Sequence, residues 1–219
     1  MSSVAGPAEL ERLSAEQVVA ELGARFGPRL AVACSFQKEA TVILDLVVRH
    51  APQALVFTLD TGVLFPETYA TWQRVQEHYG IEIAVFEGPS LARQASLHGE
   101  RLWERDPDRC CELRKVRPLT RALAGAEAWV SGLRREQSPA RAHTPKLAWD
   151  ETHQRWKASP LADWGERDVW RYIAEHDLPY HPLHDAGYAS IGCVHCTRPG
   201  SGREGRWAGS EKDECGLHA

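Results

Sequence analysis

The sequence has no excess of positive charge, no long apolar run and no basic leader. Its formal net charge is −4, which argues against a protein held on nucleic acid by its overall charge. No apolar run approaches the roughly 18 residues of a membrane span. The start, MSSVAGPAELERL, lacks the basic and apolar regions of a secretory signal. We therefore expect a cytoplasmic protein with no nucleic-acid partner and no membrane partner.

The six cysteines do not predict a disulfide framework, because the cytoplasm keeps thiols reduced. Metal binding or redox catalysis is the better explanation for them. The rest of the composition, 43% hydrophobic and 26% charged, is that of an ordinary globular chain. A chain of 219 residues can bury one good core.

Apolar patterns predict strands that alternate with helices. Strands are expected at 30–33, 54–59, 81–86 and 129–130, and helices at about 14–27, 41–49, 66–79 and 166–176. Two further runs, 146–149 and 155–158, predict a hairpin or an edge pair. This alternation favours an α/β fold with a mostly parallel sheet and helices on both faces.

The composition changes after Pro179, where glycine, histidine, proline, arginine and cysteine dominate. We expect one α/β domain over 1–185 and an irregular cysteine-rich segment with a tail over 186–219. Ligands bind beyond the carboxyl ends of parallel strands, so the loops 34–39, 60–65 and 132–138 are expected to form a site. Backbone N–H groups there would suit a phosphate.

Basic residues gather in three short clusters despite the acidic net charge. The clusters are Arg109, Arg114, Lys115 and Arg117; Arg134, Arg135 and Arg141; and Arg198, Arg203 and Arg206. Solvated surface explains any single member as well as a function does. Three clusters beside cysteine pairs or glycine turns together indicate a small, multiply anionic ligand.

Two cysteine pairs form a candidate metal site. Cys110 and Cys111 are adjacent, and Cys193 and Cys196 form a C-x-x-C motif. Four thiolates suit either tetrahedral zinc or an iron–sulfur cluster. Adjacent cysteine side chains diverge, which favours a cluster with several iron corners over one zinc ion. His195 is interpreted as a spectator.

Two cysteines remain. Cys34 ends a buried strand and is interpreted as an inert apolar residue. Cys215 lies close to the C-terminus, where a thiol could reach both a substrate and an external reductant. Its neighbours Asp213 and Glu214 oppose thiolate formation, so cations would have to come from the arginine clusters. Single exposed cysteines often have no role, and this position alone decides nothing.

A series of motifs, spread from about residue 30 to the end, resembles the assimilatory adenylyl-sulfate reductases of the APS/PAPS reductase family. The motifs are CSFQ at 34–37, LDTGVLFPET at 59–68, CCELRKVRPL at 110–119, SGLRREQS at 131–138, GCVHCT at 192–197, GREGRW at 202–207 and ECGLH at 214–218. Each is modest alone. Together and in this order they are specific.

The resemblance implies an adenine-nucleotide alpha hydrolase-like fold, related to the PP-loop pyrophosphatases, with the nucleotide-binding domain over 1–185. It implies nucleotide contacts at Ser35, Phe36, Gln37, Leu59, Thr61 and Gly132. It implies phosphosulfate contacts at Lys115, Arg203, Arg206 and His218, with Arg141 as a weaker candidate. It also implies a 4Fe–4S cluster on Cys110, Cys111, Cys193 and Cys196 that does not act as an ordinary electron carrier.

The chemistry that the resemblance implies makes Cys215 the nucleophile. Its thiolate would attack the sulfur of adenylyl sulfate and AMP would leave, which yields an S-sulfocysteine. Thioredoxin or a similar dithiol would then release sulfite. Assembly into a homo-oligomer is left open.

The sequence departs from the family at one point and leaves alternatives open. The family's first loop carries two consecutive acidic residues, whereas Lys38-Glu39-Ala40 has one, so detailed contacts of this loop stay in doubt.

The same chemistry on 3′-phosphoadenylyl sulfate is the nearest alternative, although reductases strict for that substrate generally lack the two cysteine pairs. A PP-loop sulfurtransferase or pyrophosphatase would need an S-G-G-x-D-S type of loop. A zinc-stapled binding module would leave Cys215 without a purpose.

Overall fold

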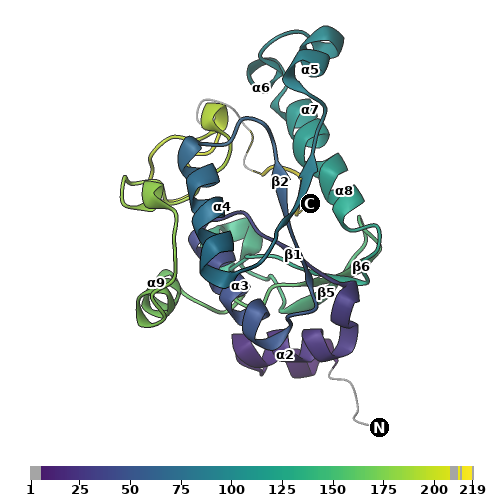
Figure 1. Ribbon diagram of the computed structural model, residues 1–219, viewed down its shortest axis with the longest axis vertical. Helices are drawn as coiled ribbons and strands as arrows, with labels where there is room; N and C mark the ends of the chain where they lie inside the picture. The colour runs from purple at the N-terminus through teal and green to yellow at the C-terminus, as the bar shows by residue number, and fades with distance from the viewer. Residues whose placement is uncertain (1–5, 208–211, 213, 219) are drawn as a thin grey trace.

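The computed structural model of the chain describes residues 6–207, 212 and 214–218. Its centre is a six-stranded sheet with the strand order β3-β2-β1-β4-β6-β5 (Figure 1). The strands are β1 (Leu30–Ala33), β2 (Leu55–Asp60), β3 (Ala84–Glu87), β4 (Ala128–Val130), β5 (Leu147–Asp150) and β6 (Arg155–Ala158). All neighbours pair in parallel except β5, which pairs antiparallel with β6 at the edge of the sheet. The predicted α/β fold class and the predicted hairpin are confirmed.

Four of the helices were expected from the sequence. They are α2 (Ala15–Phe26), α3 (Lys38–His50), α4 (Pro66–Tyr79) and α9 (Glu166–Glu175). Ser14 caps α2 by accepting a hydrogen bond from the backbone N–H of Gln17 at 3.2 Å, which satisfies one of the free donors at the helix start. No helix among the described residues is long and apolar enough to cross a membrane.

The sequence patterns missed the helices of the middle third of the chain and one short helix at its start. These are α1 (Pro7–Leu10), α5 (Leu91–His98), α6 (Leu102–Arg105), α7 (Pro107–Cys111) and α8 (Arg117–Ala122). A π-helical turn, η2 (Glu112–Val116), joins α7 to α8. This joined stretch carries the first cysteine pair.

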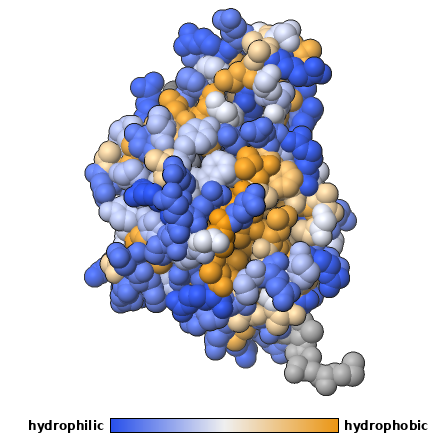
Figure 2. Space-filling model, in the orientation of Figure 1, coloured by the Kyte–Doolittle hydropathy of each residue, from blue (hydrophilic) through white to orange (hydrophobic). Residues whose placement is uncertain are grey.

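The two faces of the sheet bury different sets of side chains. Leu30 and Val32 of β1 pack with α2, α3 and α9, whereas Ala31 and Ala33 face the layer that contains α8, as the alternation of a strand requires. Leu217 of the C-terminal tail packs on this second face too. Figure 2 shows apolar side chains gathered over the strands between α4 and α8, where less helix covers the sheet.

The strand order reverses at β1, which fixes where a ligand can bind. The chain proceeds from β1 through β2 to β3 on one side, and β4 lies on the other side of β1. The loops that leave the carboxyl ends of β1 and β4 therefore diverge and leave a crevice between them.

Arg134 and Arg135 hold the loop after β4 in place. The Arg134 side chain, only 4% exposed, pairs with Glu39 at 3.0 Å and with Glu166 at 2.7 Å. Arg135 pairs with Glu11 at 2.7 Å. Arg134 and Arg135 of the second cluster therefore stabilise the loop through ion pairs, and the expectation that the three clusters together bind an anionic ligand stays a prediction.

Replacing Arg134 by alanine is expected to lower the free energy of unfolding by about 3–5 kcal/mol, because Glu39 would stay buried without its partner. Urea unfolding measures this loss. Arg29→Ala is the control, since it breaks a pair with Glu127 whose side chains are 56% and 50% exposed; its cost should stay below about 1 kcal/mol. Equal losses in the two variants would contradict the structural role of Arg134.

Candidate active site

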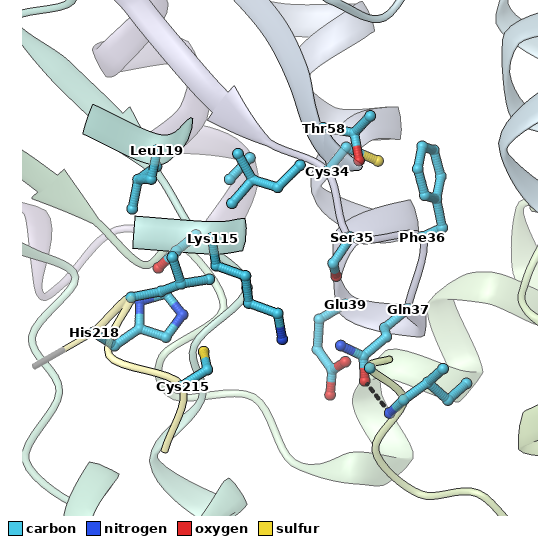
Figure 3. Close-up of a pocket in the computed structure, with 18 of the residues that line it drawn as sticks. Cys34, Ser35, Phe36, Gln37, Glu39, Thr58, Lys115, Leu119, Cys215 and His218 are labelled. Carbon is cyan, nitrogen blue, oxygen red and sulfur yellow. Dashed lines mark hydrogen bonds between the residues drawn. The ribbon is translucent and has the colours of Figure 1, made fainter. Parts of the chain in front are cut away.

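A cavity of about 190 Å³ lies at the reversal point of the sheet, where three strand loops meet the η2–α8 stretch and the C-terminal tail (Figure 3). Its lining contains every residue that the sequence predicted for substrate binding or catalysis. These are Ser35, Phe36, Gln37, Leu59, Thr61, Lys115, Gly132, Arg141, Arg203, Arg206, Cys215 and His218. The structure brings them together, and their individual roles stay predictions.

The loop after β1 forms one wall of the cavity. Phe36 has a φ of 59°, a left-handed conformation that costs a non-glycine residue free energy and is often found at functional sites. The ring of Phe36 is held by stacking on Trp72, with 5.5 Å between the ring centroids. Gln37 Oε1 accepts a hydrogen bond from the backbone N–H of Ile191 at 2.8 Å (Figure 3). This bond ties the loop to the cysteine-rich segment.

A close approach of two backbones explains the glycine after β4. A Cβ atom at Gly132 would lie 3.0 Å from the Cβ of Glu39, so a larger residue would push the loop away from the start of α3. Glu39 and Ala40 line the cavity, whereas Lys38 pairs with Glu166 at 2.8 Å.

Lys115 and Cys215 lie on the wall of the cavity opposite the loop after β1. Figure 3 shows the Lys115 ammonium and the Cys215 thiol pointing into the same space, across from Ser35 and Gln37. Burial alone would lower the pKa of Lys115, but the negative charge of Cys193 and Cys215 as thiolates outweighs burial and raises this pKa above its usual value. Lys115 is therefore a cation throughout the physiological pH range.

Three arginines complete the cationic part of the lining. Arg141 and Arg203 both bind the carboxylate of Glu214, at 2.6 Å and 2.9 Å. Arg206 lies over the ring of Trp207, 4.5 Å from its centroid, and donates to Ser190 Oγ at 3.2 Å. Each predicted basic cluster thus contributes to the cavity, but only through some of its members.

His218 anchors the end of the tail. Its ring stacks on Trp129 with the centroids 5.8 Å apart and the planes within 9°. Trp129 is itself fixed, because its Nε1 donates to Asp150 Oδ2 at 3.1 Å. Burial, followed by the nearby cations Lys157 and Arg141, lowers the pKa of His218 well below its usual value, so the imidazole is neutral.

Sequence reasoning missed several residues of the lining. They include Thr58, Leu119, Trp129, Ser131, Glu214 and Leu217. Glu214 was noted only as a charge that opposes a thiolate. Glu214 directly precedes Cys215, and the sequence contains three basic clusters. This combination could have indicated that Glu214 forms ion pairs with arginines of those clusters.

The two cysteine pairs line a second, smaller cavity, together with Trp103, Arg114, Lys115 and His195. The backbone N–H of Val194 donates to the Val63 carbonyl at 2.9 Å, which holds the C-x-x-C segment against the loop after β2. Burial, reinforced by the neighbouring thiols, raises the pKa of Cys110 to about 12 and that of Cys196 to about 11. Within the described residues, no group of three or more histidine, cysteine or acidic side chains is arranged to hold a metal ion.

The surroundings of this second cavity suit a bound anionic group. All four cysteines are free thiols. Arg114 Nε and Nη2 and Trp103 Nε1 are buried donors without a hydrogen-bond partner among the described residues. A buried donor without a hydrogen-bond partner costs folding free energy. An anionic group bound to the cysteine thiolates would accept hydrogen bonds from these donors. Lys115 lines both cavities and so connects the cysteines to the site of Cys215.

The model of the phosphoadenosine phosphosulfate reductase domain matches residues 29–199 of the chain. The chain belongs to the APS/PAPS reductase family. The predicted family and the predicted oxidoreductase class are thereby confirmed.

Relatives in this reductase family carry names for two substrates. An adenosine 5′-phosphosulfate reductase of Lysinibacillus sphaericus is 48% identical over 199 residues, which cover 88% of this chain and 85% of the relative. A phosphoadenosine 5′-phosphosulfate reductase of Gloeobacter violaceus is 46% identical over 218 residues, covering 95% and 90%. Overall similarity therefore does not separate the two substrates.

Solved structures agree with the family and the fold. The phosphoadenylyl-sulfate reductase of Candida auris, in a phosphate complex, superposes on this chain with a TM-score of 0.77 at 31% identity. The match covers 88% of this chain and 94% of the Candida auris chain. An FMN adenylyltransferase of Candida glabrata has a TM-score of 0.58 at 14% identity, with 92% and 69% covered. That second likeness is one of fold alone.

Proposed function

We propose that the protein reduces adenylyl sulfate to sulfite and AMP and takes its electrons from thioredoxin or a similar dithiol, in the cytoplasm and in assimilatory sulfate reduction. The observation that carries the proposal is the placement of the Cys215 thiol in one cavity with Lys115 and three arginines. A thiol nucleophile beside several cations suits an electrophilic sulfur that carries negatively charged oxygens.

In the first step, the Cys215 thiolate attacks the sulfur of adenylyl sulfate. An S–S bond forms, the bond from sulfur to the bridging oxygen breaks, and its electron pair leaves on the phosphate of AMP. Lys115 and the arginines bind the oxygens on which negative charge grows in the transition state. The loop of Ser35, Phe36 and Gln37, with Leu59, Thr61 and Gly132, holds the nucleotide.

In the second step, a thiolate of the dithiol attacks Cys215 Sγ and sulfite leaves with the electron pair of the S–S bond. The second thiol of the dithiol then attacks the mixed disulfide and regenerates the Cys215 thiolate. The dithiol is oxidised by two electrons and the sulfur of the substrate is reduced to sulfite. His218 orients the tail during these steps through its stacking on Trp129.

A 4Fe–4S cluster on Cys110, Cys111, Cys193 and Cys196 is part of the proposal. The four thiols around one cavity and the unused donors of Arg114 and Trp103 support it. When bound, the cluster would act through structure and local charge, since the dithiol supplies the electrons. Lys115 would then lie between the cluster and the substrate.

Replacing Cys193 by serine is expected to abolish iron binding, because a cluster loses one of its four thiolates. Anaerobically purified wild-type protein should contain about four iron atoms and about four sulfides per chain, and the variant should contain little of either. Cys34→Ser is the matched control, a free buried cysteine outside the second cavity, and it should keep its iron. Stoichiometric zinc in the wild-type protein would contradict the cluster.

The choice of adenylyl sulfate over its 3′-phosphorylated form rests on the two cysteine pairs, which the reductases strict for the second substrate generally lack. The division of the chain after residue 185 and any self-association stay predictions. We expect kcat/KM for adenylyl sulfate to exceed that for the 3′-phosphorylated nucleotide by more than about tenfold.

The deciding experiment is incubation of the anaerobic protein with adenylyl sulfate and no reductant, followed by peptide mass spectrometry. A sulfonate on Cys215 that reduced thioredoxin releases as sulfite is the expected result. An adduct formed only from the 3′-phosphorylated nucleotide would keep the chemistry and overturn the substrate. An iron-loaded protein that forms no adduct with either nucleotide would overturn the proposed function.

A further inference from the structure

The carboxylate of Glu214 fills the most cationic part of the cavity. Arg141 donates to Glu214 Oε1 from Nε at 2.9 Å and from Nη2 at 2.6 Å. Arg203 Nη2 donates to the other oxygen, Oε2, at 2.9 Å. Both oxygens of a single carboxylate are thus held by two guanidinium groups, as an anionic ligand would be.

These ion pairs are sheltered from water. The side chains of Arg141, Arg203 and Glu214 are only 10%, 19% and 27% exposed. The remaining terminal nitrogen of Arg141, Nη1, donates to Gln137 Oε1 at 2.6 Å. A new anion can therefore bind the Glu214-facing edge of Arg141 only if the carboxylate leaves it.

We propose that Glu214 is an internal anion that occupies the phosphosulfate subsite of the empty enzyme and competes with the substrate for Arg141 and Arg203. The inference rests on the proposed function, which assigns these two arginines to the substrate. A carboxylate and a sulfo or phosphoryl group each offer two oxygens to a pair of guanidinium groups. Binding of the substrate exchanges one such anion for another.

This exchange links occupation of the subsite to the position of the nucleophile. Glu214 and Cys215 are adjacent, so a carboxylate released from the arginines moves the segment that carries the thiol. Departure of AMP frees the arginines, and Glu214 returns to them. Glu214 is therefore a positioning residue, and its contact lowers the affinity for substrate.

Equilibrium binding tests the competition directly. The measurements are made by calorimetry on iron-loaded protein that carries Cys215→Ser, which prevents turnover. Adding Glu214→Gln removes the charge and keeps the shape of the side chain. We expect the dissociation constant of adenylyl sulfate to fall about tenfold, whereas that of adenosine, which has no anionic group, should not change.

Glu204→Gln is the matched control. Glu204 lies in the same segment, and within the described residues its carboxylate accepts from close neighbours in the chain, from Ser201 Oγ at 2.9 Å and from the Gly202 N–H at 3.0 Å. This variant should bind both ligands as the parent does. In the protein with Cys215 intact, Glu214→Gln should lower KM without raising kcat.

An unchanged or weaker affinity for adenylyl sulfate in Glu214→Gln would overturn the inference. An equal fall in the dissociation constants of adenosine and adenylyl sulfate would also overturn it. Glu214 would then hold the tail over the entrance of the cavity in the parent protein instead of competing with the substrate for the arginines. Failure of the parent protein to bind either adenine ligand would instead contradict the proposed function, and the inference with it.

Discussion

Replacing Cys215 by serine is expected to reduce the rate of sulfite formation from adenylyl sulfate by at least about a thousandfold, because the reaction loses its nucleophile. A serine hydroxyl is not ionised at neutral pH and is a much weaker nucleophile toward sulfur than a thiolate. The nucleotide contacts are unchanged in the variant, so binding should persist. Sulfite release with a reduced dithiol measures the rate.

Cys34 provides an internal control for this result. It lines the same cavity, but burial raises the pKa of its thiol to about 12, so it should carry no sulfonate in the wild-type protein or in the variant. A sulfonate on Cys34, or sulfite formation that survives Cys215→Ser, would contradict the assignment of the nucleophile.

Replacing Lys115 by methionine is expected to lower kcat/KM for adenylyl sulfate by about a hundredfold to a thousandfold, the usual effect of losing one group that stabilises charge in a transition state. Methionine has a similar length and no charge. Lys115 is buried, 8% exposed, and its ammonium faces Cys215 (Figure 3). Steady-state kinetics with a reduced dithiol measure the change.

Two comparisons separate this effect from a general one. The iron content of Lys115→Met should equal that of the wild type, since the lysine is not a ligand. Lys157→Met removes another partly buried cation, which lies over the Trp129 ring at 5.1 Å and outside the lining of the main cavity; its loss should be much smaller. Loss of iron in the Lys115 variant, or equal losses in both variants, would contradict the proposed role.

The first half of the fold could be predicted because its patterns are regular. β1 and α4 have the bounds expected from the sequence, since a short apolar run and Pro66 mark them clearly. β3 begins at Ala84, not at Ile81, because Ile81 and Ile83 pack with Val75 of α4 and contribute to another cluster. Apolar residues that precede a strand but pack elsewhere therefore make the strand appear longer in the sequence than it is in the structure.

The stretch over 91–122 could not be predicted because its apolar residues do not follow a helical period. Leu113 lies within the π-helical turn and Leu119 lies after it in α8. The turn contains one residue more than an α-helical turn, which breaks the spacing of 3.6. The charged residues between them conceal the remaining pattern. The site residues in this stretch could be named only because the motif around Cys110 resembles that of a known family.

The roles of the arginines were predictable only in part. Sequence shows that a basic residue is present but not what it faces, and buried partners far along the chain decide this. Arg134 meets Glu39 and Glu166, whereas Arg141 reaches the cavity. The distinction depends on the loop after β4, whose course no local pattern fixes.

The π-helical turn makes the length of one segment as critical as its composition. Deleting a single residue from η2 would restore ordinary α-helical spacing and change the directions in which the remaining side chains of the turn point, that of Lys115 among them. Lys115 could then no longer line both cavities. Point substitutions at solvent-facing positions of η2 should therefore be tolerated far better than any insertion or deletion, and natural variation in this stretch should preserve its count of residues.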